Sequence, residues 1–114
     1  MYIDFEAGNK AYKLRLNTRN TILLEKQLGC NPLNIFATDG QTLPTITSMV
    51  AILHASLQQY QHNINLNDAY DIFDEWLANG HSSTDFMTVI MDIYKVSGII
   101  PEDIKPEEEE TKNA

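Results

Sequence analysis

Three carboxylates, Asp71, Asp74 and Glu75, stand at a spacing that could do chemistry. Three and four residues apart, they would share one face of a helix, where carboxylates can form an acid–base pair or bind a metal ion. The chain places no histidine or cysteine at a spacing that would complete a ligand set. The pattern therefore favours a solvated or partner-facing acidic surface over a catalytic or metal site.

The segment from Asn63 to Asp74 has some features of a calcium-binding loop. Oxygen-bearing residues occupy its first, third and fifth positions, but an EF-hand loop also needs Gly at the sixth position and Glu at the twelfth. The chain has Asp68 and Asp74 there. A helix that begins at Asn65, with Asp68 in its first turn, explains the same residues, so we expect a helix cap and no calcium site.

The remaining reactive residue types are scattered along the chain. The three histidines, His54, His62 and His81, form no HExxH motif or paired ligand set. Cys30 has no histidine beside it, and the Ser82–Thr84 segment lacks the glycines of a nucleophile elbow. We therefore predict no catalytic residue, no metal and no cofactor, and expect that the protein is not an enzyme.

The scaffold predicted for these residues is mainly α with an N-terminal β-hairpin (α+β). Apolar residues alternate with polar ones in two strands, with Ile3 and Phe5 in the first and Tyr12, Leu14 and Leu16 in the second. A two-stranded hairpin is marginally stable alone. We expect its apolar face to pack on about four to five helices, or its edge to pair with another strand.

Capping residues and helix breakers predict where these helices begin and end. The first helix begins at Asn17 or Thr18 and ends at Gly29, and a short helix covers 32–37. The longest helix begins at Thr42 and Pro44, and the third helix runs from Asn65 to Gly80. The fourth helix begins after Ser82 or Ser83 and ends at Ser97 and Gly98. Their periodicity predicts the buried faces. The inward residues are Ile22, Leu24 and Leu28 in the first, Ile46, Met49, Val50, Leu53, Leu57 and Tyr60 in the longest, Leu66, Ala69, Tyr70, Phe73, Trp76 and Leu77 in the third, and Phe86, Val89, Ile90, Ile93, Tyr94 and Val96 in the fourth.

Composition predicts one domain, residues 1–100, followed by a disordered acidic tail at 101–114. The net charge of −8 disfavours nucleic acid and anionic membranes as partners, and no apolar run is long enough to span a bilayer. The N-terminus lacks the pattern of a signal peptide, and Cys30 cannot form an internal disulfide. We therefore expect a cytoplasmic protein with no nucleic-acid or membrane partner.

Charge is divided unevenly along the chain. Five cations precede residue 27 and the next is Lys95, whereas the middle of the chain carries acids. This pattern leaves three interpretations open: self-association of the basic end on the acidic body, an acidic face that meets a Lys-rich partner, and a solvated surface that only maintains solubility.

Segments 14–36, 52–77 and 89–100 resemble the tail assembly chaperones of long-tailed (siphovirus-type) phages and prophages of Gram-positive bacteria. The most characteristic pieces are Leu24-Glu25-Lys26-Gln27-Leu28-Gly29, followed by Asn31-Pro32-Leu33, and the stretch from Ile52 to Tyr60. The resemblance extends over nearly the whole chain up to Ile100. These matches carry no catalytic signature.

The resemblance implies a small helical protein that binds the tape-measure protein, keeps it soluble during assembly of the tail tube, and then leaves, so that the mature virion lacks it. In many such phages a frameshifted longer product recruits the major tail protein. We expect the partner contacts to come from Asp71, Asp74 and Glu75, with Tyr60 and Trp76 as exposed aromatic anchors. Packing in the core is the alternative role for both aromatic residues.

A structural tail component is the alternative function. Such a protein would assemble through the edge of its hairpin or through its charged faces, and would stay in the virion. A homo-oligomer is compatible with either function.

Overall fold

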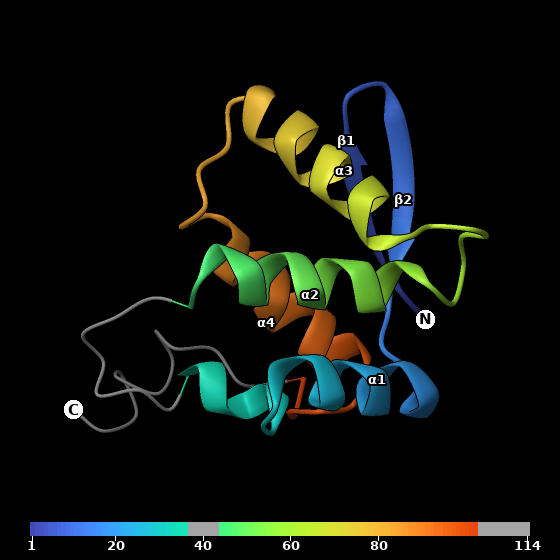
Figure 1. Cartoon of the computed structure of the whole chain (residues 1–114), viewed down its shortest axis with the longest axis vertical. Coiled ribbons are helices and arrows are strands. Elements are labelled where there is room, and N and C mark those ends of the chain that lie inside the picture. Colours follow the sequence, from blue (N-terminus) through green and yellow to red (C-terminus); the bar gives the residue numbers. More distant parts are fainter. Residues whose placement is uncertain (37–43, 103–114) are drawn as a thin grey trace.

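The computed structural model describes residues 1–36 and 44–102 of the 114-residue chain. Within that part, an antiparallel hairpin is followed by four α-helices and one short 3-10 helix (Figure 1). The predicted α+β class is therefore confirmed. Residues 37–43, between the predicted short helix and the longest helix, and the predicted tail beyond Glu102 lie outside the described residues.

Strands β1 (Ile3–Ala7) and β2 (Lys10–Leu14) form the hairpin, with a two-residue turn at Gly8 and Asn9. Gly8 has a φ of 63°, which suits a residue without a Cβ. Ile3 pairs with Leu14 and Phe5 with Tyr12, so the apolar residues lie on one face, as predicted.

Helix α1 (Thr18–Leu28) begins where Asn17 accepts a hydrogen bond from the Asn20 amide. It ends at Gly29, whose φ of 72° is left-handed, and both ends agree with the prediction. The short helix η1 (Pro32–Phe36) follows, with Pro32 in its first turn. Leu24 is buried as predicted, but Ile22 is exposed.

Helix α2 (Ile46–Leu57) begins later and ends earlier than its sequence predicts. Thr45, rather than Thr42 or Pro44, is its N-cap, and the threonine side chain accepts a hydrogen bond from the Ser48 amide. The helix has 12 residues and is shorter than the third helix, so it is not the longest of the described helices. Most of its predicted stripe is buried, but Ile46 and Tyr60 are exposed.

Helix α3 (Leu66–Ala78) begins with a complete capping box. The Asp68 amide donates to Asn65 at 2.8 Å, and the Asn65 amide donates to the Asp68 carboxylate at 2.9 Å. The predicted cap is therefore confirmed, and it uses the side-chain oxygen of Asn65, which would be the third-position ligand of a calcium loop. Tyr70, which periodicity places on the buried side, is exposed.

Helix α4 (Phe86–Val96) begins after a turn in which Ser82 and Asp85 exchange side-chain to backbone hydrogen bonds of 2.9 and 3.3 Å. It ends at Ser97 and Gly98, as predicted. The hydroxyl of Tyr94 donates a 3.0 Å hydrogen bond to the Pro32 carbonyl, which fastens α4 to η1.

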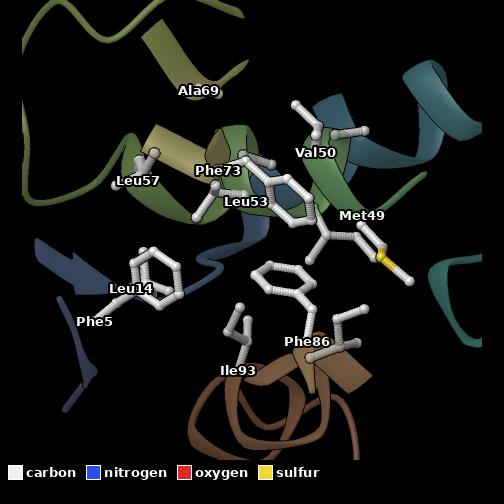
Figure 2. Close-up of a cluster of buried hydrophobic side chains, with 14 of the residues drawn as sticks. Phe5, Leu14, Met49, Val50, Leu53, Leu57, Ala69, Phe73, Phe86 and Ile93 are labelled. Carbon is white, nitrogen blue, oxygen red and sulfur yellow. The ribbon is translucent and has the colours of Figure 1, made fainter. Parts of the chain in front are cut away.

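The hydrophobic core lies between α2 and the elements around it. Helix α2 packs between α1 and α3, while α4 crosses behind it in Figure 1 and the hairpin packs against α2, α3 and α4. Figure 2 shows side chains from the hairpin, α2, α3 and α4 meeting around Phe86. This leaves the outer surfaces of α1, α2 and α3 side by side on the other face of the molecule.

Candidate partner-binding face

The outward side of α3 carries two of the three predicted carboxylates. Asp71 and Asp74 are exposed, three residues apart, and therefore share one side of the helix. Tyr70 lies beside them and exposes 48% of its surface. Because Asp74 stands one turn after Tyr70, the outward surface of α3 presents an aromatic ring next to carboxylates.

Glu75 is also exposed, one turn after Asp71 on α3, at the border of the helix with the hairpin. Its carboxylate occupies the position that a side chain at Gly8 would fill. Burial raises the pKa of the Tyr12 hydroxyl, and the negative charges of Glu75 and Asp68 raise it further. The structure therefore keeps Glu75 beside Asp71, as the sequence grouped them, but its carboxylate lies against the hairpin turn.

Trp76 belongs to the core, which corrects the expectation that it is an exposed anchor. Its side chain is 4% exposed. The indole stacks on Phe5 at 5.6 Å between ring centroids, meets Phe86 edge-on at 5.4 Å, and lies 4.4 Å from the nearly parallel ring of His81. A ring enclosed in this way cannot reach a partner, so the alternative of core packing holds for Trp76.

Tyr60 is an exposed residue in the turn after α2, 36% of its surface being accessible. Its ring meets Tyr2 at 5.3 Å between centroids, and the Lys13 ammonium lies 4.8 Å from the centre of the Tyr2 ring. Tyr60 therefore joins an aromatic pair at the open end of the hairpin. Its position is compatible with an anchor, although its described aromatic neighbour is Tyr2 rather than a residue of α3.

Four exposed apolar residues were not identified as a surface by the sequence pattern. Their exposed fractions are 46% for Ile22, 50% for Leu23, 49% for Ile46 and 48% for Tyr70. Ile22, Ile46 and Tyr70 fit the helical period of buried residues, which is why periodicity assigned them to the core. The sequence signal that could have revealed this surface is the width of the apolar stripes on these helices, which is greater than one buried helix face needs.

Two of these residues line a groove of about 230 Å³ between α1, α2 and α3, which we call the three-helix groove. Its lining residues are Gln27, Ile46, Thr47, Val50, Ala51, Leu66 and Tyr70. Leu23 lies one turn before Gln27 on the same side of α1, and so extends the apolar surface along that helix. The walls of the groove are mostly apolar.

Opposite charges flank the three-helix groove. Arg19 and Lys26 are exposed on α1 near Leu23, whereas Asp71 and Asp74 are exposed on α3. We call the first pair the basic edge and the second the acidic edge. The outer surface therefore changes from positive to apolar to negative across the three helices.

The C-terminal end of the outer edge of β2 is occupied by hydrogen bonds from within the chain. The side-chain amide of Gln61 accepts from the Lys13 amide at 2.8 Å and donates to the Lys13 carbonyl at 2.9 Å. The Arg15 amide just beyond the strand donates to the Ser56 carbonyl at 3.0 Å. Another strand could pair at this edge only by displacing these bonds, which weakens the case for assembly through β2.

The residues that could do covalent or metal chemistry lie apart. Among residues 1–36 and 44–102, no group of three or more His, Cys, Asp or Glu side chains could hold a metal ion. Cys30 is exposed, and His81 stacks on Trp76. Within the same residues, no helix is long and apolar enough to cross a membrane.

Residues 4–113 match a protein-family model described as a family of unknown function, DUF6096. No curated protein and no solved structure shows a significant match to the chain.

Proposed function

We propose that this chain, which belongs to the DUF6096 family, is a tail assembly chaperone of a long-tailed phage or prophage. It would bind the tape-measure protein in the host cytoplasm, keep that protein soluble while tail-tube subunits assemble, and be absent from the mature virion. A frameshifted longer form would carry the contact to the major tail protein.

The observation that supports this proposal is that exposed Tyr70 lies next to exposed Asp71 and Asp74 on the outward surface of α3. An exposed aromatic ring next to carboxylates suits an amphipathic helix that carries lysine or arginine beside its apolar stripe. The long, helical tape-measure protein expected from the resemblance would expose such segments until tail subunits cover them.

The charges suit reversible binding. Carboxylates at the rim of an interface speed association and select cationic partners, but contribute little net affinity because water and salt screen them. A chaperone must release its client, so a contact with one aromatic anchor and a charged rim fits the proposed role better than a large apolar interface would.

The proposal is tested by co-expressing this chain with the protein encoded immediately downstream of it. We expect the downstream protein to be insoluble alone and soluble in a complex that contains several copies of this chain. Light scattering on the affinity-purified complex gives the stoichiometry. If the downstream protein gains no solubility and nothing co-purifies, the chaperone proposal is wrong.

A structural tail component is the second candidate. In this fold it would assemble through β1 or through the charged edges, because bonds to Gln61 and Ser56 already occupy the backbone at the C-terminal end of β2. Mass spectrometry of purified particles separates the two proposals: the structural component is present in stoichiometric amounts, and the chaperone is absent.

A further inference from the structure

Exposed apolar side chains gather at and beside the three-helix groove. Leu23, Ile46 and Tyr70 each expose about half of their surface on adjoining helices. Contiguous apolar surface of this kind marks an interaction site in most proteins, whereas single exposed apolar residues do not. The charges beside the groove indicate what could cover it.

The basic and acidic edges are complementary to each other. Arg19 and Lys26 lie on the α1 side of the groove, and Asp71 and Asp74 on the α3 side. Glu25, the one acid of α1, is two positions from Leu23 and therefore points to nearly the opposite side of the helix. A partner that fits this face must place acidic residues opposite the basic edge, apolar residues opposite the groove, and basic residues opposite the acidic edge.

A second copy of the chain carries all three kinds of surface, and one of its possible orientations places them opposite their complements. Two identical faces can meet about a two-fold axis that lies in the plane between them. With the axis parallel to α2, α1 of each chain lies opposite α3 of the other, so the basic edge meets the acidic edge twice. With the axis across α2, α1 meets α1 and α3 meets α3, and like charges oppose one another.

We infer that this protein forms a two-fold dimer in which the three-helix grooves face each other with the axis parallel to α2. Ile46 and Tyr70 pack at the centre, and Arg19 and Lys26 of each chain pair with Asp71 and Asp74 of the other. Charge complementarity selects this arrangement, and the apolar centre supplies its affinity.

The size of the face sets the expected strength. Helices of 12 and 13 residues are roughly 20 Å long at 1.5 Å per residue, and three such helices about 9 Å apart make a face of similar width. The projected area, roughly 400 Å² per chain, is below the ~800 Å² of a standard interface. The dimer is therefore expected to dissociate in the micromolar range rather than the nanomolar range.

Sedimentation velocity of the purified chain, from low micromolar to several hundred micromolar, tests the dimer. We expect the mass to rise from one chain to two and to stop there. A chain that stays monomeric throughout, or a mass that keeps rising past two copies, overturns the inference.

Two matched tyrosine variants test which surface is used. Tyr70→Ser is expected to raise the dissociation constant of the dimer about tenfold or more, because it removes the largest apolar side chain from the centre. Tyr60→Ser makes the same change at an exposed tyrosine outside the groove, and should leave the constant unchanged. Equal effects of the two variants would overturn the assignment to the three-helix groove.

Charge reversal tests the orientation. One variant carries Arg19→Glu, Lys26→Glu, Asp71→Lys and Asp74→Lys together, so that its basic and acidic edges are exchanged. It should dimerise with itself as the wild type does, because α1 of each chain still faces an α3 of opposite charge. It should not associate with the wild type, because each edge would then face an edge of like charge. A heterodimer of the variant with the wild type, which an axis across α2 would favour, or a monomeric variant while the wild type dimerises, would overturn the axis.

The dimer covers Tyr70, Asp71 and Asp74, the surface proposed to bind the tape-measure protein, so the two associations would compete. These measurements use the chain alone, so they do not depend on the proposed function. The absence of a dimer would leave the chaperone proposal standing, and failure of the co-expression test would leave the dimer standing.

Discussion

The hydroxyl of Tyr94 donates a hydrogen bond to the carbonyl oxygen of Pro32, 3.0 Å away and 62 positions earlier in the chain. Both groups are buried, so neither has water as an alternative partner. Phe36 meets the same tyrosine ring edge-on at 5.7 Å. One residue of α4 thereby holds both ends of η1 on the core.

Replacing Tyr94 with phenylalanine should lower the free energy of unfolding by about 1 to 2 kcal/mol, because the buried Pro32 carbonyl loses its partner. Urea unfolding followed by circular dichroism measures the change. Tyr60→Phe is the matched control, since Tyr60 is exposed, and it should be neutral. A neutral result for Tyr94→Phe would contradict a stabilising role for this hydrogen bond.

The same tyrosine should make the protein sensitive to alkali. Burial raises the pKa of the Tyr94 hydroxyl well above its usual value of 10.0, and the nearby Cys30 raises it further. Well below pH 10 the hydroxyl is protonated in both states and stability is unaffected. As pH rises above 10, the unfolded chain releases this proton while the folded chain retains it, so stability falls.

Unfolding midpoints measured from pH 9 to pH 11 test the predicted fall in stability. One retained proton corresponds to a slope of about −1.4 kcal/mol per pH unit in the free energy of unfolding. The Tyr94→Phe variant should lose a slope of that size, and a smaller slope should persist from Tyr12, whose pKa is also raised. Identical slopes in the variant and the wild type would show that Tyr94 titrates normally in the folded protein.

The capping box of α3 gives a prediction that separates a cap from a calcium loop. Asn65→Ala should lower the unfolding free energy by about 1 kcal/mol, because the Asp68 amide loses its acceptor. Asn67→Ala makes the same change at an exposed position in the first turn, and should have little effect. Added calcium should not change the melting temperature of the wild type; a rise that Asn65→Ala abolishes would indicate a calcium site.

The termini of the helices were largely predictable because local rules determine them. Asn17, Gly29 and Asn65 satisfy backbone groups at helix ends through bonds that span a few residues, and such bonds are visible in sequence. The beginning of α2 was predicted too early because Thr42, Pro44 and Thr45 all suit a helix start, and the choice among them depends on tertiary packing.

The candidate face was not predictable from the pattern. A helical period shows which residues share a side, but not how wide a side the neighbouring helices cover. Ile46 and Tyr70 fall at the margin of their stripes, next to a groove that α1 leaves open. For Trp76 the helical period was right, because it placed the residue on the buried side of α3, where Phe5 and Phe86 pack against it. The expectation that Trp76 is an exposed anchor was wrong. The helical period and the tertiary packing therefore assign different burial to residues such as Ile46 and Tyr70, which lie on a surface left open for a partner.

The burial of Trp76 predicts that its removal damages the fold. Trp76→Ala should lower the unfolding free energy by about 3 to 5 kcal/mol, as large-to-small changes do in a packed core. Tyr60→Ala removes an aromatic ring of comparable size from the surface, and should cost about 1 kcal/mol or less. A stable Trp76→Ala variant that fails to bind the downstream protein would restore Trp76 as an anchor.

The contact of the Glu75 carboxylate with the hairpin turn predicts that Asp71 and Asp74 contribute more than Glu75 to binding a partner. Changing Asp71 and Asp74 together to serine should weaken binding of the downstream protein about three- to tenfold at low salt, the effect of two exposed charges at an interface rim. Glu75→Ser should have a smaller effect, because that carboxylate lies against the hairpin turn at Gly8.

Binding measured by titration calorimetry at several salt concentrations tests both halves of this prediction. The wild-type affinity should fall as salt increases, and the Asp71/Asp74 variant should show a flatter dependence, since screening acts on charges that the variant has lost. Circular dichroism must show that both variants are folded. Unchanged affinity in the folded Asp71/Asp74 variant, or a larger loss in Glu75→Ser, would show that the partner does not bind the outward surface of α3.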